Sequence, residues 1–227
     1  PKVRQMLPPK DEIKALPSEL QRIVRYTFEQ KFYAMPRFMG KQFVFSNLIL
    51  LDRKDLHLVI RILGTEELAQ AFLSVGKRAL GEFCRRLPKE HAEELINSVK
   101  SVDRTDLMDV KTAQRFLARV LINFDNTEEL FQKAGIFRLA KAAQIEDDSF
   151  HKAFSQRVPK DVGSIYGDYV EKAAEIAEWE EDVIKRLQNR ILEKISQLSQ
   201  NETISNRYAN LEYGFHDVPP PQPPAEE

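Results

Sequence analysis

Residues 55–88 read DLHLVIRILGTEELAQAFLSVGKRALGEFCRRLP, and this stretch decides the expected fold. Its apolar residues recur every three or four positions, which is the spacing of one helix face. They form three successive stripes: Leu56, Val59, Ile60 and Leu63, then Leu68, Ala71, Phe72 and Val75, then Leu80, Phe83, Cys84 and Leu87. We expect Gly64-Thr65-Glu66-Glu67 to end the first helix and to cap the second. The stretch therefore predicts an all-α protein.

The helical pattern continues on both sides of this stretch. Before it, Ser18 caps an expected helix over residues 18–34, which ends before Pro36. After it, Pro88 opens a helix with the sequence KEHAEELINSV, and Asn126 caps a later one. We expect residues 1–42 to form an N-terminal arm and helix, and residues 43–145 to form a multi-helix domain.

The character of the chain changes after residue 145. Acidic residues with Pro159 and Gly163 predict a linker over residues 146–163, and a long helix is expected within residues 164–212. Its stripe advances by about 3.7 residues per step, which suits a straight helix better than a coiled coil. The members are Ile176, Trp179, Val183, Leu187, Ile191, Ile195 and Leu198. Residues 213–227 are rich in proline, and we expect a disordered tail.

Charge and composition exclude several classes of protein. The 227 residues include 34 basic and 35 acidic side chains, so bulk electrostatic coating of nucleic acid is disfavoured. No apolar run is long enough to span a bilayer. Cys84 is the single cysteine, and no basic-then-apolar leader opens the sequence, so we expect a cytoplasmic protein.

The residues that usually carry enzyme chemistry are scattered. The four histidines, His57, His91, His151 and His216, lack partners at metal-ligand spacing, and we expect them on the surface. The glycines form no phosphate loop, and Cys84 lies on an apolar face as an expected buried thiol. The sequence therefore predicts no enzyme, no catalytic residue, no metal and no cofactor.

One segment carries a local excess of positive charge. Between residues 77 and 89 the basic residues are Lys77, Arg78, Arg85, Arg86 and Lys89, and Glu82 is the one acid. Two interpretations stay open: a solvated helix face answered by Glu90, Glu93 and Glu94, or a docking patch for a protein or nucleic acid. Phe83 is the only aromatic residue there and belongs to the apolar stripe, so base stacking gains no support.

Residues 43–121 resemble the C-terminal region of the flagellar rotor switch protein FliG. Phe43-Val44-Phe45 is similar to the Met-Phe-X-Phe connector of that family, with Gln42 in place of Met. The resemblance continues through three short motifs and a spaced group: Leu50-Leu51-Asp52, Ile60-Arg61, Thr65-Glu66-Glu67-Leu68-Ala69, and Val110, Ala113 and Gln114. We therefore expect a divergent FliG-like paralogue with an armadillo-like helical fold.

The resemblance also implies functional residues. It makes Phe43, Val44 and Phe45 a hinge between helical modules, and it places a partner-docking ridge on residues 88–101. The ridge candidates are Lys89, Glu90, Glu93, Glu94, Asn97 and Lys100, beside the basic patch of Lys77, Arg78, Arg85 and Arg86. The charges with which the family transmits torque fall on Leu73, Glu90, Asn97 and Ser98, none of which has the family's charge.

These features predict a non-enzymatic component of, or adaptor to, a flagellar rotor and switch complex. Expected partners are other rotor or switch proteins on the membrane-ring or stator side, or a second copy bound through the long C-terminal helix. The expected location is the cytoplasm, at the inner-membrane face of the flagellar base. Two alternatives stay open: a helical adaptor in a secretion-type or regulatory assembly, and, less favoured, nucleic-acid binding by residues 77–89.

Overall fold

A computed structural model of the protein describes residues 42–73, 75–102, 107–120, 126–176 and 180–219. All of them lie in the second of two compact units, Lys41–Glu227. The helix expected over residues 18–34 lies outside the described residues. Across the described part, the structure is helical, and the one β-type pairing is an isolated bridge between Phe43 and Tyr213. The predicted all-α class is confirmed.

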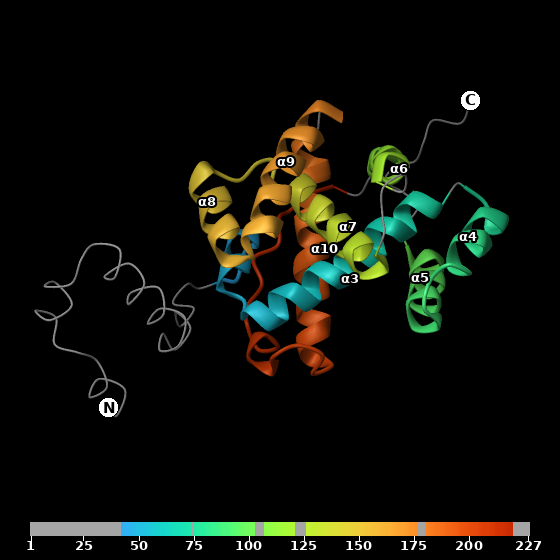
Figure 1. Ribbon diagram of the computed structural model, residues 1–227. Helices are drawn as coiled ribbons and strands as arrows, with labels where there is room; N and C mark the ends of the chain where they lie inside the picture. The colour runs from blue at the N-terminus through green and yellow to red at the C-terminus, as the bar shows by residue number, and fades with distance from the viewer. Residues whose placement is uncertain (1–41, 74, 103–106, 121–125, 177–179, 220–227) are drawn as a thin grey trace, which may run out of the picture. The chain divides into compact units, whose positions relative to one another are not determined.

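The α-helices are labelled in Figure 1, and two short 3₁₀ helices, η2 and η4, complete the set among the described residues. In chain order they are η2 (Phe45–Leu50), α3 (Arg53–Phe72), α4 (Lys77–Cys84), α5 (Lys89–Ser101), α6 (Leu107–Val120), α7 (Thr127–Ala142), α8 (Asp148–Arg157), α9 (Lys160–Ile176), α10 (Glu181–Gln200) and η4 (Asn206–Tyr208). Asn126 caps α7 as predicted, because its side chain accepts a hydrogen bond from the Glu128 N–H at 2.9 Å.

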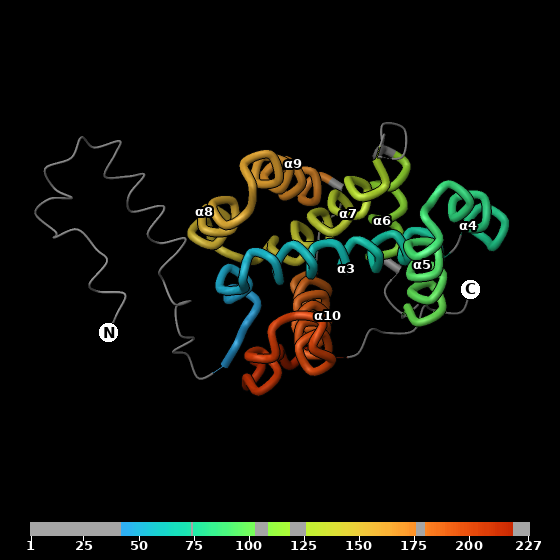
Figure 2. Tube along the Cα trace, turned by 60° about the horizontal axis from the view of Figure 1, so that its bottom comes forward, coloured from blue at the N-terminus to red at the C-terminus, as the bar shows by residue number. Residues whose placement is uncertain are grey.

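The helices α3 and α7 form the centre of this unit and make its most extensive contact. The helices α5 and α6 pack on α3, while α9 and α10 pack on α7 (Figures 1 and 2). Aromatic rings fill the layer between α6, α7 and α9: Phe116 stacks on Phe137 at 4.0 Å, and Tyr169 meets both rings edge-on. In both views α4 lies at the opposite end of the unit from α8.

Two glycines allow α3 and α7 to cross at very short range. A methyl group on Gly64 would lie 1.8 Å from the Phe131 carbonyl oxygen, and one on Gly135 would lie 1.8 Å from the Ile60 carbonyl oxygen. The prediction that Gly64-Thr65-Glu66-Glu67 divides two helices is wrong, because α3 runs unbroken through it. Gly64 is needed here for the approach of a second helix backbone and not for a turn.

The expected linker over residues 146–163 is also mostly helical. Asp147 caps α8 by accepting a hydrogen bond from the Phe150 N–H at 2.9 Å, so this acid starts a helix. Pro159 directly precedes α9, where its carbonyl accepts the Gly163 N–H at 2.9 Å. The single long helix expected beyond residue 164 is instead two helices, α9 and α10.

The apolar stripe of α10 packs against other elements of the same chain. Val183, Leu187, Ile191 and Ile195 are all buried, and α10 packs on α7, η2 and η4. Much of this stripe is therefore covered within the chain, and self-association through α10 stays a prediction. Trp179 lies outside the described residues.

The first part of the expected disordered tail is ordered against α10. Asn189 and His216 exchange two hydrogen bonds, from Asn189 Nδ2 to the His216 carbonyl at 2.9 Å and from the His216 N–H to Asn189 Oδ1 at 2.8 Å. The Gln188 side-chain oxygen accepts a hydrogen bond from the His216 ring nitrogen Nε2 at 2.7 Å. Residues 213–219 therefore lie along the helix, which corrects this part of the prediction, and residues 220–227 lie outside the described part.

The crossing of α3 and α7 predicts a large cost for Gly64→Ala. The added methyl group meets backbone atoms, which have no rotamer to move into, so we expect a loss of about 3 kcal/mol or more in the free energy of unfolding. Urea unfolding followed by circular dichroism measures this loss.

Gly167→Ala on α9 is the matched control. No heavy atom lies within 4 Å of a methyl group at Gly167, and alanine favours a helix over glycine by about 0.5–1 kcal/mol. We expect unchanged or slightly increased stability. Equal unfolding midpoints for the two variants would show that the glycine crossing does not constrain the fold.

Candidate functional site

The helices α4 and α5 form a projecting pair that carries most of the predicted site residues. Gly76 caps α4 with a φ of +92°, a conformation that favours glycine. Phe83 anchors α4 to α3 through the Phe72 ring at 4.9 Å. Cys84 is buried as predicted, and burial raises the pKa of its thiol. The outer side chains of the pair are therefore held on a fixed apolar base.

The predicted basic patch is a surface of α4 and its C-terminal turn. The side chains of Lys77, Arg78, Arg85 and Arg86 are all exposed. Arg85 pairs with Glu82 at 2.7 Å, and both partners face solvent. Such a pair stabilises the fold little, so the patch remains available to an acidic partner.

The predicted ridge on α5 divides between two faces. Lys89, Glu90, Glu93 and Lys100 are exposed, and the Lys89–Glu93 pair at 3.8 Å keeps side-chain exposures of 90% and 64%. Glu94 turns toward α3, where it meets Arg61 at 3.4 Å. Asn97 lines a cavity together with Glu94. The candidates named from the sequence therefore do not form one continuous row.

The predicted hinge residues are mostly interior. Phe43 and Phe45 are buried, and Val44 between them is exposed. The backbone of Phe43 pairs with the C-terminal segment, donating to the Glu212 carbonyl at 2.6 Å and accepting from the Gly214 N–H at 3.0 Å. Sequence reasoning named the two aromatic anchors but missed this backbone pairing, because the partner segment lies about 170 residues away in the chain.

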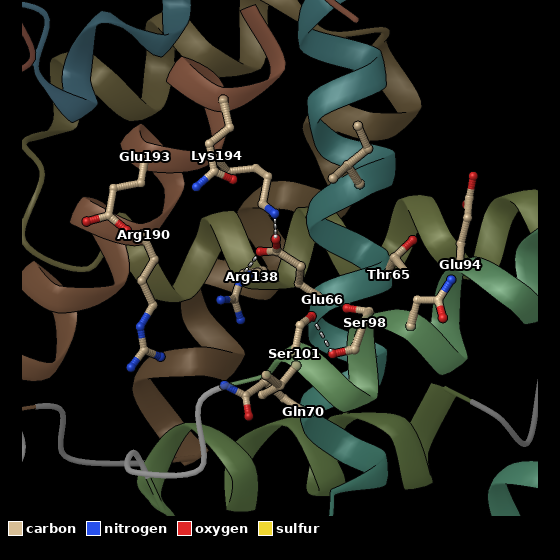
Figure 3. A pocket seen from close by; sticks show the side chains of 14 residues that line it. Thr65, Glu66, Gln70, Glu94, Ser98, Ser101, Arg138, Arg190, Glu193 and Lys194 are labelled. Atoms are coloured by element: carbon tan, nitrogen blue, oxygen red, sulfur yellow. Dashed lines mark hydrogen bonds and ion pairs between the residues drawn. The ribbon is translucent and has the colours of Figure 1, made fainter. Parts of the chain in front are cut away.

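A cavity of about 910 Å³ lies between α3, α5, α7 and α10, and we call it the α5–α10 trough (Figure 3). Its lining is polar apart from Ile62 and Val102. The walls are formed by Thr65, Glu66 and Gln70 of α3, Glu94, Asn97, Ser98 and Ser101 of α5, Arg138 of α7, and Arg190, Glu193, Lys194 and Gln197 of α10. At its edge Lys194 pairs with Glu66 at 2.8 Å.

A buried charge network lies beneath the trough. Arg138 meets Glu67 at 3.3 Å and Asp109 at 3.4 Å, and Lys141 meets Glu67 at 2.8 Å and also contacts Asp109. Gln70 donates to Asp109 at 3.1 Å. All five side chains are buried, so each charge depends on its partners for stabilisation.

The two acids of this network respond differently to their surroundings. Burial alone would raise the pKa of Asp109, but Lys141 and Arg138 more than offset it and lower the pKa to about 2. Burial raises the pKa of Glu67, and Lys141 and Arg138 offset only part of this effect. Asp109 is therefore the acid whose charge holds the network together.

Sequence reasoning missed the network and misjudged the histidines. Glu67, Arg138 and Lys141 lie among buried apolar neighbours on their helices, which was the available signal. His57 alone is exposed. His91, His151 and His216 are half-buried and hydrogen-bonded, so the expectation of four surface histidines is corrected.

Within the described ranges, no cluster of three or more potential ligands could hold a metal ion. Among the same residues, none of the helices has the length and apolar character needed to cross a bilayer.

The charge network predicts that Asp109→Asn strongly destabilises the fold. The change leaves Arg138 and Lys141 buried with one acid fewer, which costs about 3–5 kcal/mol when a buried ion pair is broken. The folded pKa of Asp109 lies below its ordinary value of 3.8, so its stabilisation is full above about pH 5 and is lost as the pH falls toward 2. The deficit of the variant should therefore shrink over that interval.

Urea unfolding at several pH values measures this deficit, and Glu93→Gln on the exposed face of α5 is the control. Its surface pair with Lys89 predicts a change below about 0.5 kcal/mol. An Asp109→Asn deficit as small as that of the control, or one that stays constant between pH 5 and 2, contradicts the network as described.

Residues 35–131 match the family described as the FliG C-terminal domain. No curated protein and no solved structure matches the chain. The matched stretch includes η2, α3, α4, α5 and α6 and reaches the first turns of α7, and the family has an all-α, armadillo-like fold that agrees with these helices. Residues 35–131, less than half of the chain, are therefore similar to the FliG C-terminal domain family.

Proposed function

We propose that this protein is a non-enzymatic, FliG-like component of, or adaptor to, the flagellar rotor and switch complex. It acts by docking the α4–α5 pair onto another motor protein. The observation that carries the proposal is the family match together with the exposed charges that α4 and α5 hold on an apolar base. Expected partners are switch, membrane-ring or stator-side proteins at the cytoplasmic face of the flagellar base.

The two helices offer adjoining surfaces of different charge. The basic patch on α4 carries four cations near one acid, whereas the first turns of α5 carry Glu90 and Glu93. Exposed charges of this kind attract an oppositely charged surface, and salt screens the attraction over about 8–10 Å. Docking by the pair is therefore fast, reversible and dependent on ionic strength.

The departures from the family pattern favour a scaffolding role over torque transmission. Leu73 is half-buried, Asn97 is neutral, and Ser98 lines the α5–α10 trough. These positions lack the charges that the resemblance implies for a torque-generating ridge. We infer that the partner contacts the outer charges of α4 and α5, and that the FliG torque charges are not used.

The connector is proposed to set how this unit is presented to the rest of the assembly. Phe43 and Phe45 fix the chain to the unit by burial and by ring contacts, Phe43 with Tyr213 and Phe45 with Phe150, both at 5.6 Å. Their packing, with the backbone pairing of Phe43, fixes residues 43–45 on this unit.

Reversing the outer charges of α5 tests the docking surface. The variant Glu90→Lys with Glu93→Lys should lower copurification with rotor-ring proteins about tenfold, which equals a loss of about 1.4 kcal/mol in binding. Tagged protein expressed in flagellated cells, with motility scored on soft agar, provides both readouts.

Glu171→Lys with Glu175→Lys is the matched control, because both acids are exposed on α9, a helix that does not belong to the proposed surface. Unchanged rotor binding and motility in the α5 variant would show that this face is an ordinary solvated surface and not a docking site. A strain without the protein that builds and switches its motors normally, with no protein at the motor base, would overturn the proposal. Stable capture of non-motor proteins would instead favour the adaptor alternative.

A further inference from the structure

We propose that the α5–α10 trough is a second docking site, which receives two turns of a polar, mixed-charge helix from a partner protein. The trough lies on a different face of α5 from the outer charges discussed above. The inference therefore goes beyond the proposed function and can hold or fail independently of it.

Two parallel stretches of helix face line the trough. The α5 residues that line it, Glu94, Asn97, Ser98 and Ser101, and the α10 residues, Arg190, Glu193, Lys194 and Gln197, each follow the spacing i, i+3, i+4, i+7. Two helix faces, each two turns long, therefore flank the cavity, with Thr65 and Glu66 of α3 between them (Figure 3).

The size of the trough agrees with this occupant. Two turns of helix with short side chains fill a cylinder about 10 Å wide and about 11 Å long, or about 860 Å³. The cavity measures about 910 Å³. A single amino acid or inorganic ion leaves most of this space empty, whereas a helix completes the packing of α5 against α10.

The chemistry of the lining identifies the kind of helix. No aromatic residue lines the trough, and the cations Arg138, Arg190 and Lys194 are balanced by the acids Glu66, Glu94 and Glu193. The lining offers no aromatic ring on which a nucleotide base could stack and no net positive charge to bind a polyanion. It also has no apolar wall that could bury the face of an apolar helix. A helix with both acidic and basic side chains matches this pattern.

The trough also holds a buried polar atom without a partner. Gln70 is 2% exposed, its amide nitrogen donates to Asp109, and its Oε1 accepts no hydrogen bond from the residues that the structure describes. This oxygen is enclosed, so a donor on the occupant, such as a lysine or an amide side chain, reaches it after the Gln70 side chain turns toward the trough. The ion pairs at the rim, Lys194–Glu66 and Arg61–Glu94, keep one partner at least 30% exposed, so an occupant can exchange with them.

The occupant is identified by photo-crosslinking of the full chain in cells. A photoreactive amino acid replaces Ser98 in the trough, and mass spectrometry maps the crosslinked peptide. We expect a helical segment of another protein that bears both charge signs. A synthetic peptide with that segment should then bind the purified chain, and its affinity should fall with added salt.

Three variants decide whether the trough itself binds. Ser101→Trp fills the cavity and Lys194→Glu inverts one wall charge, and each should weaken the peptide at least tenfold. Lys172→Glu on the exposed part of α9 is the control and should leave the affinity unchanged. The double variant of Glu90 and Glu93 described above should also leave it unchanged, which separates this site from the outer face of α5.

Four outcomes overturn the proposal. They are the absence of a crosslink from residue 98, a crosslink to a non-helical or apolar segment, a crosslink to this chain or a second copy, and full peptide affinity in Ser101→Trp. Asn97→Trp repeats the blocking test from a more exposed position in case Ser101→Trp does not fold, as judged by circular dichroism.

Discussion

The close crossing of α3 and α7 is the constraint on which the rest of this structure depends. Gly64 and Gly135 bring the two backbones together, and each glycine is followed three residues later by a charged residue, Glu67 on α3 and Arg138 on α7. One helical turn beyond the crossing, these side chains are therefore forced to face each other without room for water. Ion pairing is the arrangement that keeps both charged in such a place, and the 3.3 Å contact shows that they use it.

The charge network connects the α3–α7 crossing to α6 and to the α5–α10 trough. Asp109 brings α6 into the contact between α3 and α7, and Arg138 reaches from the network to the floor of the α5–α10 trough. The floor of the trough is thus tied by ion pairs to the central crossing, while its rim includes the partly exposed Lys194–Glu66 pair.

Sequence reasoning predicted the features that depend on local chemistry and missed those that depend on contacts at long range. The all-α class, the cap at Asn126 and the α10 stripe follow from spacing and side-chain type alone. Gly64 was misread because a glycine that ends a helix and one that admits a second backbone look identical in sequence. Asp147 likewise looked like part of a charged linker, although its side chain caps α8 by accepting the Phe150 N–H. Nothing near Phe43 in sequence indicates that its backbone pairs with residues 212–214.

The same geometry gives a physical reason for the neutral residues on α5. The FliG pattern implies acids at Asn97 and Ser98, where the structure places the wall of the trough beside Glu94. Two further acids there would crowd three negative charges on one helix face opposite Glu193, and half-buried Ser98 would lose hydration as it ionised. Neutral hydrogen-bonding groups avoid this repulsion and still present donors and acceptors to an occupant. Asn97 and Ser98, where α5 departs from the FliG pattern, are therefore also residues that line the trough.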